Sequence, residues 1–173
     1  MLELIIAIAI LVIDQVSKYL TEIYIPFGTS IPLFDGVFQL SNVHNTGAAW
    51  GILAGWQWLF LVITPIVCAF LIWILVARRG EIKLLGRICI VLLVSGAIGN
   101  LIDRVAFSYV RDMLDFCLIN FPVFNVADSA ITVGAILLCI DTLFVKKGSI
   151  FGVIDTIKLP SKKTAEQETQ ADA

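Results

Sequence analysis

Residues 58–77, WLFLVITPIVCAFLIWILVA, decide the fold class, because this run contains no charged side chain. A helix needs about 20 apolar residues to cross the hydrocarbon core of a bilayer, and neighbouring helices allow it to contain a proline. Apolar runs of similar length, each interrupted by one or two charged residues, occupy residues 4–20, 84–102 and 126–145. The sequence therefore predicts an all-α membrane protein with four transmembrane helices.

The composition of the whole chain supports this class. Of 173 residues, 59% are hydrophobic and 15% are charged, whereas a soluble domain contains about 25% charged residues. No basic stripe with interleaved aromatic residues is present, so nucleic acid is not an expected partner. A single histidine and four cysteines without a CxxC pair form no metal-binding pattern. We expect no metal and no cofactor.

Charges in the connecting segments predict the orientation in the membrane. The link between the second and third helices and the segment after the fourth are rich in Lys and Arg, whereas residues 23–57 contain neither. Short cytoplasmic loops carry the excess of Lys and Arg, so we expect both termini in the cytoplasm. Residues 1–159 are expected to form one four-helix domain, and residues 160–173 a polar, disordered cytoplasmic tail.

The first outer loop has the pattern of a small β structure. Turn-forming residues, including Gly28 and the pair Asp35-Gly36, precede a weakly alternating stretch at residues 37–40. We therefore expect a small extracytoplasmic β platform between the first and second helices.

Polar side chains from three helices are predicted to meet in the outer third of the membrane. Charged residues inside spans are rare and usually functional. Gly96 and Gly99 lie on the same helical stripe as two of these side chains, which allows close helix packing. Carboxyls held together at low dielectric share a proton, so the pair offers an acid and a base that activate water. The converging side chains are Asp14, Lys18, Asn100, Asp103, Asn125 and Asp128.

Simpler explanations remain open for several of these residues. Asn125 alone is typical of a helix N-cap, with Asp128 favoured in the first turn by the helix dipole. Asp14 and Lys18 alone indicate an i,i+4 ion pair, and Asp103 with Arg104 an anchor pair at the interface. The whole cluster also fits an ion or headgroup site in a small membrane transporter or lipid-binding module, or a purely structural subunit.

The chain resembles bacterial lipoprotein signal peptidase, the type II signal peptidase, in five motifs that span nearly its whole length. They are DQVSK at residues 14–18, NTGAAWG at 45–51, GAIGNLIDR at 96–104, VRD at 110–112 and FNVADS at 124–129. The resemblance implies an aspartic endopeptidase of the bacterial cytoplasmic membrane. Such an enzyme removes signal peptides from prolipoproteins by cutting before a cysteine that carries a diacylglyceryl group. Prolipoproteins and membrane lipids are the expected partners, and a monomer is expected.

The resemblance also implies roles for individual residues. The two catalytic aspartates correspond to Asp112 and Asp128, and Asp115 is the rival for the first of them. Arg111 departs from the family pattern, where a small apolar residue is more usual, and is expected to alter the outer flap. The positions that shape or support the site correspond to Asn45, Gly47, Asn100, Asp103, Arg104, Asn125, Asp14 and Lys18.

Overall fold

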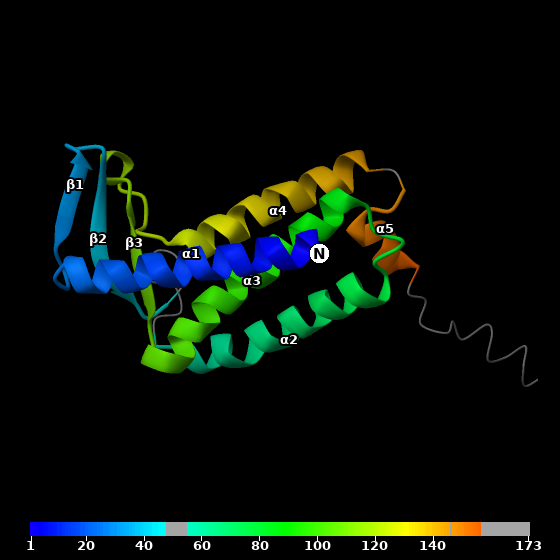
Figure 1. The fold of residues 1–173 in the computed structure, drawn as a ribbon, viewed down its shortest axis with the longest axis horizontal. Helices are drawn as coiled ribbons and strands as arrows, with labels where there is room; N and C mark the ends of the chain where they lie inside the picture. Colours follow the sequence, from blue (N-terminus) through cyan, green and yellow to red (C-terminus); the bar gives the residue numbers. More distant parts are fainter. Residues whose placement is uncertain (48–54, 146, 157–173) are drawn as a thin grey trace, which may run out of the picture.

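A computed structural model describes residues 1–47, 55–145 and 147–156 (Figure 1). Within these ranges, four helices are long and apolar enough to cross a membrane, which confirms the predicted fold class. They are α1 (Leu2–Tyr24), α2 (Gln57–Ala77), α3 (Leu84–Phe107) and α4 (Val126–Phe144). The predicted tail at 160–173 and part of the motif at 45–51 lie outside the described residues.

The α3 helix forms the centre of the bundle. Half of its most apolar stretch is buried, against 11–22% in the other three helices, which surround it. Many large apolar side chains of α1, α2 and α4 are exposed, including Ile13, Ile66 and Ile136. Such exposure suits contact with lipid tails, because the bilayer rather than the protein interior then covers these side chains.

Two glycines bring α3 against its neighbours. A Cβ atom at Gly96 would lie 2.4 Å from the carbonyl oxygen of Ala127 on α4. A Cβ at Gly99 would lie 2.8 Å from Oδ2 of Asp14 on α1. A larger residue would push the backbones of α3 and α4 apart at position 96 and displace the Asp14 carboxyl at position 99, so the predicted stripe of small residues is confirmed as a packing feature.

The expected β platform is present, but it contains a strand that was not expected. Strands β1 (Ser30–Phe34), β2 (Phe38–Asn45) and β3 (Val110–Asp115) form an antiparallel sheet in the order β1-β2-β3. The segment between α3 and α4 supplies β3. The sheet lies at the end of the bundle where α1 ends and α4 begins (Figure 1). It therefore brings two separate loops to one end of the molecule.

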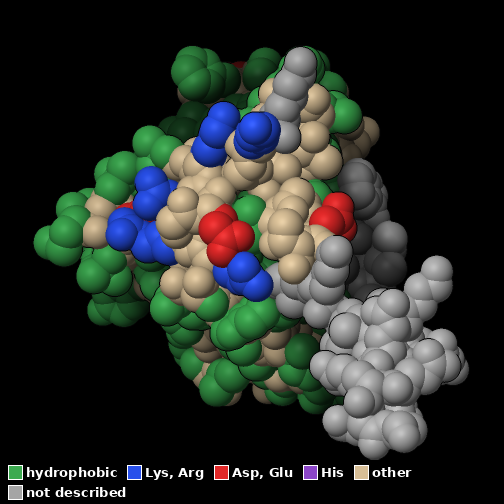
Figure 2. Space-filling view, turned by 90° about the vertical axis from the view of Figure 1, so that its right-hand side faces the viewer, with side chains coloured by type: hydrophobic (Ala, Val, Ile, Leu, Met, Phe, Trp, Pro, Cys, Tyr) green, Lys and Arg blue, Asp and Glu red, His purple; other side chains and the backbone are tan. Residues whose placement is uncertain are grey.

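The opposite end contains a short helix that was also not expected, α5 (Ile150–Asp155). Ile150 and Val153 pack with Ile74 and Ile90 in a buried apolar cluster. The fully buried Asp141 accepts a hydrogen bond from the Ile150 backbone N–H at 2.8 Å. Figure 2 looks onto this end and shows Lys and Arg side chains there.

The close approach of α3 and α4 can be tested with Gly96→Ala. The added methyl group would overlap the Ala127 carbonyl oxygen, so the free energy of unfolding should fall by about 1–3 kcal/mol. Thermal unfolding of the purified protein in detergent measures this change. Gly80→Ala is the matched control, because a Cβ there meets no atom within 4 Å. Equal melting temperatures for the two variants would contradict the packing described above.

Candidate active site

The structure brings Asp112 and Asp128 to one site at the sheet end of the bundle. Asp112 lies on β3 and is 1% exposed, and Asp128 lies in the first turn of α4. The Asn125 side chain connects them, because its Nδ2 donates to Asp112 and its Oδ1 accepts from the Asp128 backbone N–H. Residues from two distant segments thus form one hydrogen-bonded unit.

Every oxygen of these two carboxyls accepts a hydrogen bond from an N–H group. Asp112 Oδ1 accepts from Asn125 Nδ2 at 2.7 Å, and Asp112 Oδ2 accepts from Asn45 Nδ2 at 2.9 Å. Asp128 Oδ1 accepts from Asn100 Nδ2 at 2.7 Å, and Asp128 Oδ2 accepts from the Asn125 backbone N–H at 3.2 Å. All four donors are therefore neutral amides, and none of these four bonds comes from a Lys or Arg side chain.

A second partner fixes the orientation of each of the three asparagine amides. In every case a group that can only donate bonds to the amide oxygen, so the NH₂ group must face a carboxyl. These bonds run from the Gly47 backbone N–H to Asn45 (2.9 Å), from the Asp128 backbone N–H to Asn125 (2.8 Å) and from Lys18 Nζ to Asn100 (3.0 Å). The donor arrangement around the two carboxyls is therefore unambiguous.

The simpler explanation for Asn125, that it is a helix N-cap, is confirmed, but Asn125 also has a second role. Asn125 is the N-cap of α4 and forms a reciprocal capping box with Asp128. Capping uses its side-chain oxygen, which leaves the NH₂ group to donate to Asp112 at 2.7 Å and to Asn100 Oδ1 at 3.0 Å. The same residue therefore begins the helix and joins the two carboxyls.

A buried ion cluster lies next to this unit. Lys18 Nζ is 2.9 Å from Asp14 Oδ2 and 3.3 Å from Asp103 Oδ2, and all three side chains are fully buried. The predicted Asp14–Lys18 ion pair is thus confirmed. Asp103 and Arg104 do not form the anchor pair considered above. Arg104 instead donates to the Gly47 carbonyl oxygen at 3.1 Å.

Two further residues complete the ion cluster. Gln15 Nε2 donates to Asp14 at 3.0 Å and to Asp103 at 3.2 Å. Arg111 Nη2 donates to Asp103 Oδ1 at 2.8 Å, so its side chain faces this cluster. This role of Arg111 was not predicted from the sequence. The charges could have indicated it, because two buried carboxylates beside one Lys require another cation.

The rival aspartate of β3 has other partners. Asp115 Oδ2 accepts from Gln39 Nε2 at 2.6 Å and from Ser41 Oγ at 2.9 Å, both on β2. Within the described ranges, no group of three His, Cys, Asp or Glu side chains is placed to hold a metal ion.

Burial raises the pKa of Asp112 to about 7, and the nearby Asp128 carboxylate adds to this rise. Hydrogen bonds from Asn45 and Asn125 and the positive charge of Lys18 act in the opposite direction. Asp112 therefore exchanges its proton near neutral pH, where an ordinary aspartate is fully ionised.

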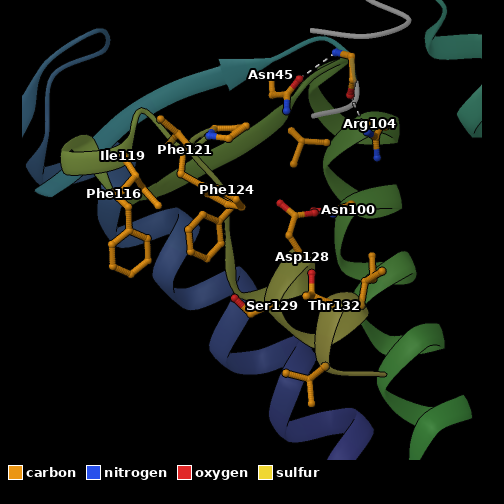
Figure 3. Close-up of a pocket in the computed structure, with 16 residues that line it drawn as sticks. Asn45, Asn100, Arg104, Phe116, Ile119, Phe121, Phe124, Asp128, Ser129 and Thr132 are labelled. Atoms are coloured by element: carbon orange, nitrogen blue, oxygen red, sulfur yellow. Dashed lines mark hydrogen bonds between the residues drawn. The ribbon is translucent and has the colours of Figure 1, made fainter. Parts of the chain in front are cut away.

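A cavity of about 630 Å³ opens beside the carboxyls. Figure 3 shows Asn100 and Asp128 on one side of it and Phe116 and Phe124 on the other. The lining includes Asn45, which is bonded to Asp112, but not Asp112 itself. The remaining lining residues among those drawn are Gly47, Arg104, Val110, Ile119, Phe121, Pro122, Val123, Ser129, Ile131, Thr132 and Val133. One polar and one apolar wall thus enclose a space large enough for part of a peptide.

Comparisons with known proteins agree with this architecture. The family model described as Signal peptidase (SPase) II matches residues 6–144. A lipoprotein signal peptidase of Lactiplantibacillus plantarum is 44% identical over 143 residues, covering 81% of this chain and 93% of that relative. One of Brevibacillus brevis is 43% identical over 136 residues, covering 79% of this chain and 91% of that relative.

Solved structures of two bacterial membrane enzymes have the same fold. One has a TM-score of 0.77 at 36% identity and covers 82% of this chain and 87% of its own. The other has a TM-score of 0.74 at 35% identity and covers 82% and 92%. These matches confirm the resemblance seen in the five motifs. They do not indicate either of the alternatives considered above, a membrane transporter or lipid-binding module and a structural subunit. The chain is a multi-pass bacterial membrane protein that belongs to the signal peptidase II family.

Proposed function

We propose that the protein removes signal peptides from prolipoproteins by cleaving before the diacylglyceryl-modified cysteine, with Asp112 and Asp128 as its catalytic pair. The observation that carries this proposal is the pair of carboxyls beside the cavity, each oxygen of which accepts an N–H hydrogen bond. Family membership supports the reaction class, and the names of the two relatives support the substrate class.

In the proposed mechanism, Asp112 and Asp128 share one proton and hold a water molecule between them. Two neighbouring carboxyls in a low-dielectric site resist double ionisation, so one remains an acid while the other is a base. The ionised carboxyl takes a proton as the water attacks the scissile carbonyl, and the protonated carboxyl donates to the developing oxyanion. The carboxyl that took the proton then gives it to the leaving nitrogen as the C–N bond breaks, and the other carboxyl takes back a hydroxyl proton, which restores the shared proton. The raised pKa of Asp112 supports this division of roles near neutral pH.

The apolar wall of the cavity is suited to an apolar substrate. Phe116, Ile119 and Phe121 line one wall, and each of these side chains is also at least 41% exposed. A signal peptide with apolar residues would contact this wall, while the diacylglyceryl chains remain in the bilayer. Membrane partitioning of those chains would then concentrate the substrate at the site.

We also infer that the site faces the outside of the cytoplasmic membrane and that both termini lie inside. The carboxyls lie at the sheet end of the bundle, and the Lys and Arg side chains of Figure 2 gather at the opposite end. Arg79 and Lys83 in the α2–α3 link and Lys147 after α4 are exposed there. The positive-inside rule then sets the orientation.

The catalytic pair is tested by Asp112→Asn and Asp128→Asn, assayed on a purified diacylated prolipoprotein by the appearance of the shortened product. Each change removes an acid–base group, so cleavage should fall by about 10²–10⁴-fold or more. Asp115→Asn is the matched control, because Asp115 is the other acid on β3 and bonds to β2. It should retain most of the activity. Full activity of purified Asp112→Asn or Asp128→Asn would contradict the assignment.

The pH dependence of cleavage provides a second test. Because the pKa of Asp112 is raised to about 7, its proton is present below that pH and is lost above it. The doubly ionised pair has no acid for the oxyanion, so kcat/KM should fall as the pH rises through about 7. Initial rates on the same prolipoprotein from about pH 5 to about pH 9 measure this limb. A rate that stays constant up to the alkaline limit would contradict a shared proton.

A further inference from the structure

We propose that Arg111 is a positioning residue, which clamps β3 to Asp103 on α3 and thereby holds the carboxyl of the next residue, Asp112, in its reactive place. This inference rests on the proposed function of Asp112. Nothing in the motif comparison assigns Arg111 such a role, because the resemblance marks it as a departure from the family pattern.

Arg111 makes three hydrogen bonds to the single carboxylate of Asp103. Its backbone N–H donates to Oδ2 at 3.0 Å, its Nε donates to Oδ2 at 3.2 Å and its Nη2 donates to Oδ1 at 2.8 Å. The side-chain bonds form a planar fork that fits a carboxylate. The backbone bond acts directly on the main chain of the residue that precedes Asp112.

The guanidinium group is also bound to α1. Nη1 donates to Glu22 Oε2 at 3.0 Å, and Nη2 donates to Gln15 Oε1 at 3.0 Å. Its carbon atom lies 4.6 Å from the centre of the Phe107 ring. One side chain therefore fixes β3 to two membrane helices at the same point. A Lys at this position could supply a positive charge, but its ammonium group could not donate hydrogen bonds to Asp103, Glu22 and Gln15 in this geometry at once.

The β2–β3 ladder is irregular directly beside Asp112. The pairing of β2 with β3 shifts register between Leu40, opposite Leu114, and Val43, opposite Asp112. Two β2 residues, Ser41 and Asn42, lie opposite the single β3 residue Met113 there, so the bulge interrupts the regular ladder next to Asp112. The main chain of Arg111 is in addition held at both of its polar groups, by Asp103 at the N–H and by a long 3.4 Å bond from Asn125 Nδ2 at the carbonyl oxygen.

A loose β3 would affect the rate more than substrate binding. The Asp112 carboxyl depends on bonds of 2.7 Å from Asn125 and 2.9 Å from Asn45, which movement of the strand would lengthen. A displacement of about 1 Å at a reacting group can cost about 10²-fold in rate. Arg111 is not among the residues that line the cavity, so its loss removes no direct contact to a substrate there.

The test compares purified Arg111→Lys and Arg111→Gln with the unaltered protein, using kcat and KM for a diacylated prolipoprotein. Thermal unfolding gives the folded fraction by which each rate is corrected. We expect kcat to fall by about 10- to 100-fold in Arg111→Gln, with KM within about twofold. Arg111→Lys should lose less, because it keeps a charge beside Asp103. A KM-independent loss of kcat with partial rescue by Lys distinguishes positioning from a merely structural contribution.

Two control variants separate the clamp from other ion pairs. Glu22→Gln removes the charge of this partner but keeps an oxygen that can accept from Arg111 Nη1, and it leaves all three bonds to Asp103, so its kcat should stay near that of the unaltered protein. Arg78→Gln breaks the exposed pair with Glu81, at 2.8 Å, at the other end of the bundle and should also leave kcat unchanged.

The inference is overturned if folded Arg111→Gln has unaltered kcat, if KM rises while kcat stays constant, or if Glu22→Gln causes the same loss. Failure of the proposed function would look different. In that case the unaltered protein would not cleave the prolipoprotein, or Asp112→Asn would remain active. An active protein with an inactive Asp112→Asn variant supports the catalytic pair whatever the Arg111 variants do.

Discussion

The ammonium group of Lys18 is the contact on which the sheet end of the bundle depends. It is fully buried and lies 2.9 Å from Asp14, 3.3 Å from Asp103 and 3.0 Å from Asn100 Oδ1. Burying any one of these charges alone would cost several kcal/mol, and attraction between them offsets that cost only when geometry and hydrogen bonds are good. The buried charges of α1 and α3 are therefore tolerated only when they are together. This requirement fixes how the two helices pack against each other.

The same cluster reaches both carboxyls of the site indirectly. Lys18 orients Asn100, which donates to Asp128, and Asp103 binds Arg111, which precedes Asp112. Lys18 and Arg111 thus act on the two carboxyls through an intervening or adjacent residue. The groups that donate hydrogen bonds to the carboxyls are neutral amides. A cation bonded directly to Asp112 would favour its ionised form. Neutral donors instead allow its pKa to rise to about 7 while the carboxyl remains fixed in position.

The sequence predicted the membrane spans and the meeting of polar side chains from three helices, but it did not predict β3 or the partners of Asp103 and Arg104. The four spans follow from run length. Strand β3 carries three charged residues without apolar alternation, and pairs with β2 across the whole of α2 and α3. Asp103 and Arg104 were paired because they are adjacent, yet neighbouring residues on a helix do not face each other. Asp103 therefore turns to Lys18 and Arg111, and Arg104 donates to the Gly47 carbonyl oxygen.

The ion cluster in turn requires backbones to come closer than most side chains allow. At Gly99, a Cβ would lie 2.8 Å from Asp14 Oδ2, the oxygen that also contacts Lys18. The Ala127 backbone N–H of α4 donates to the other oxygen of Asp14 at 2.8 Å. A larger residue at position 99 would displace Asp14 from both partners and release the ammonium group that orients Asn100. The placement of the carboxyl pair therefore begins with a missing side chain on α3, because only that gap lets three helices share one buried charge.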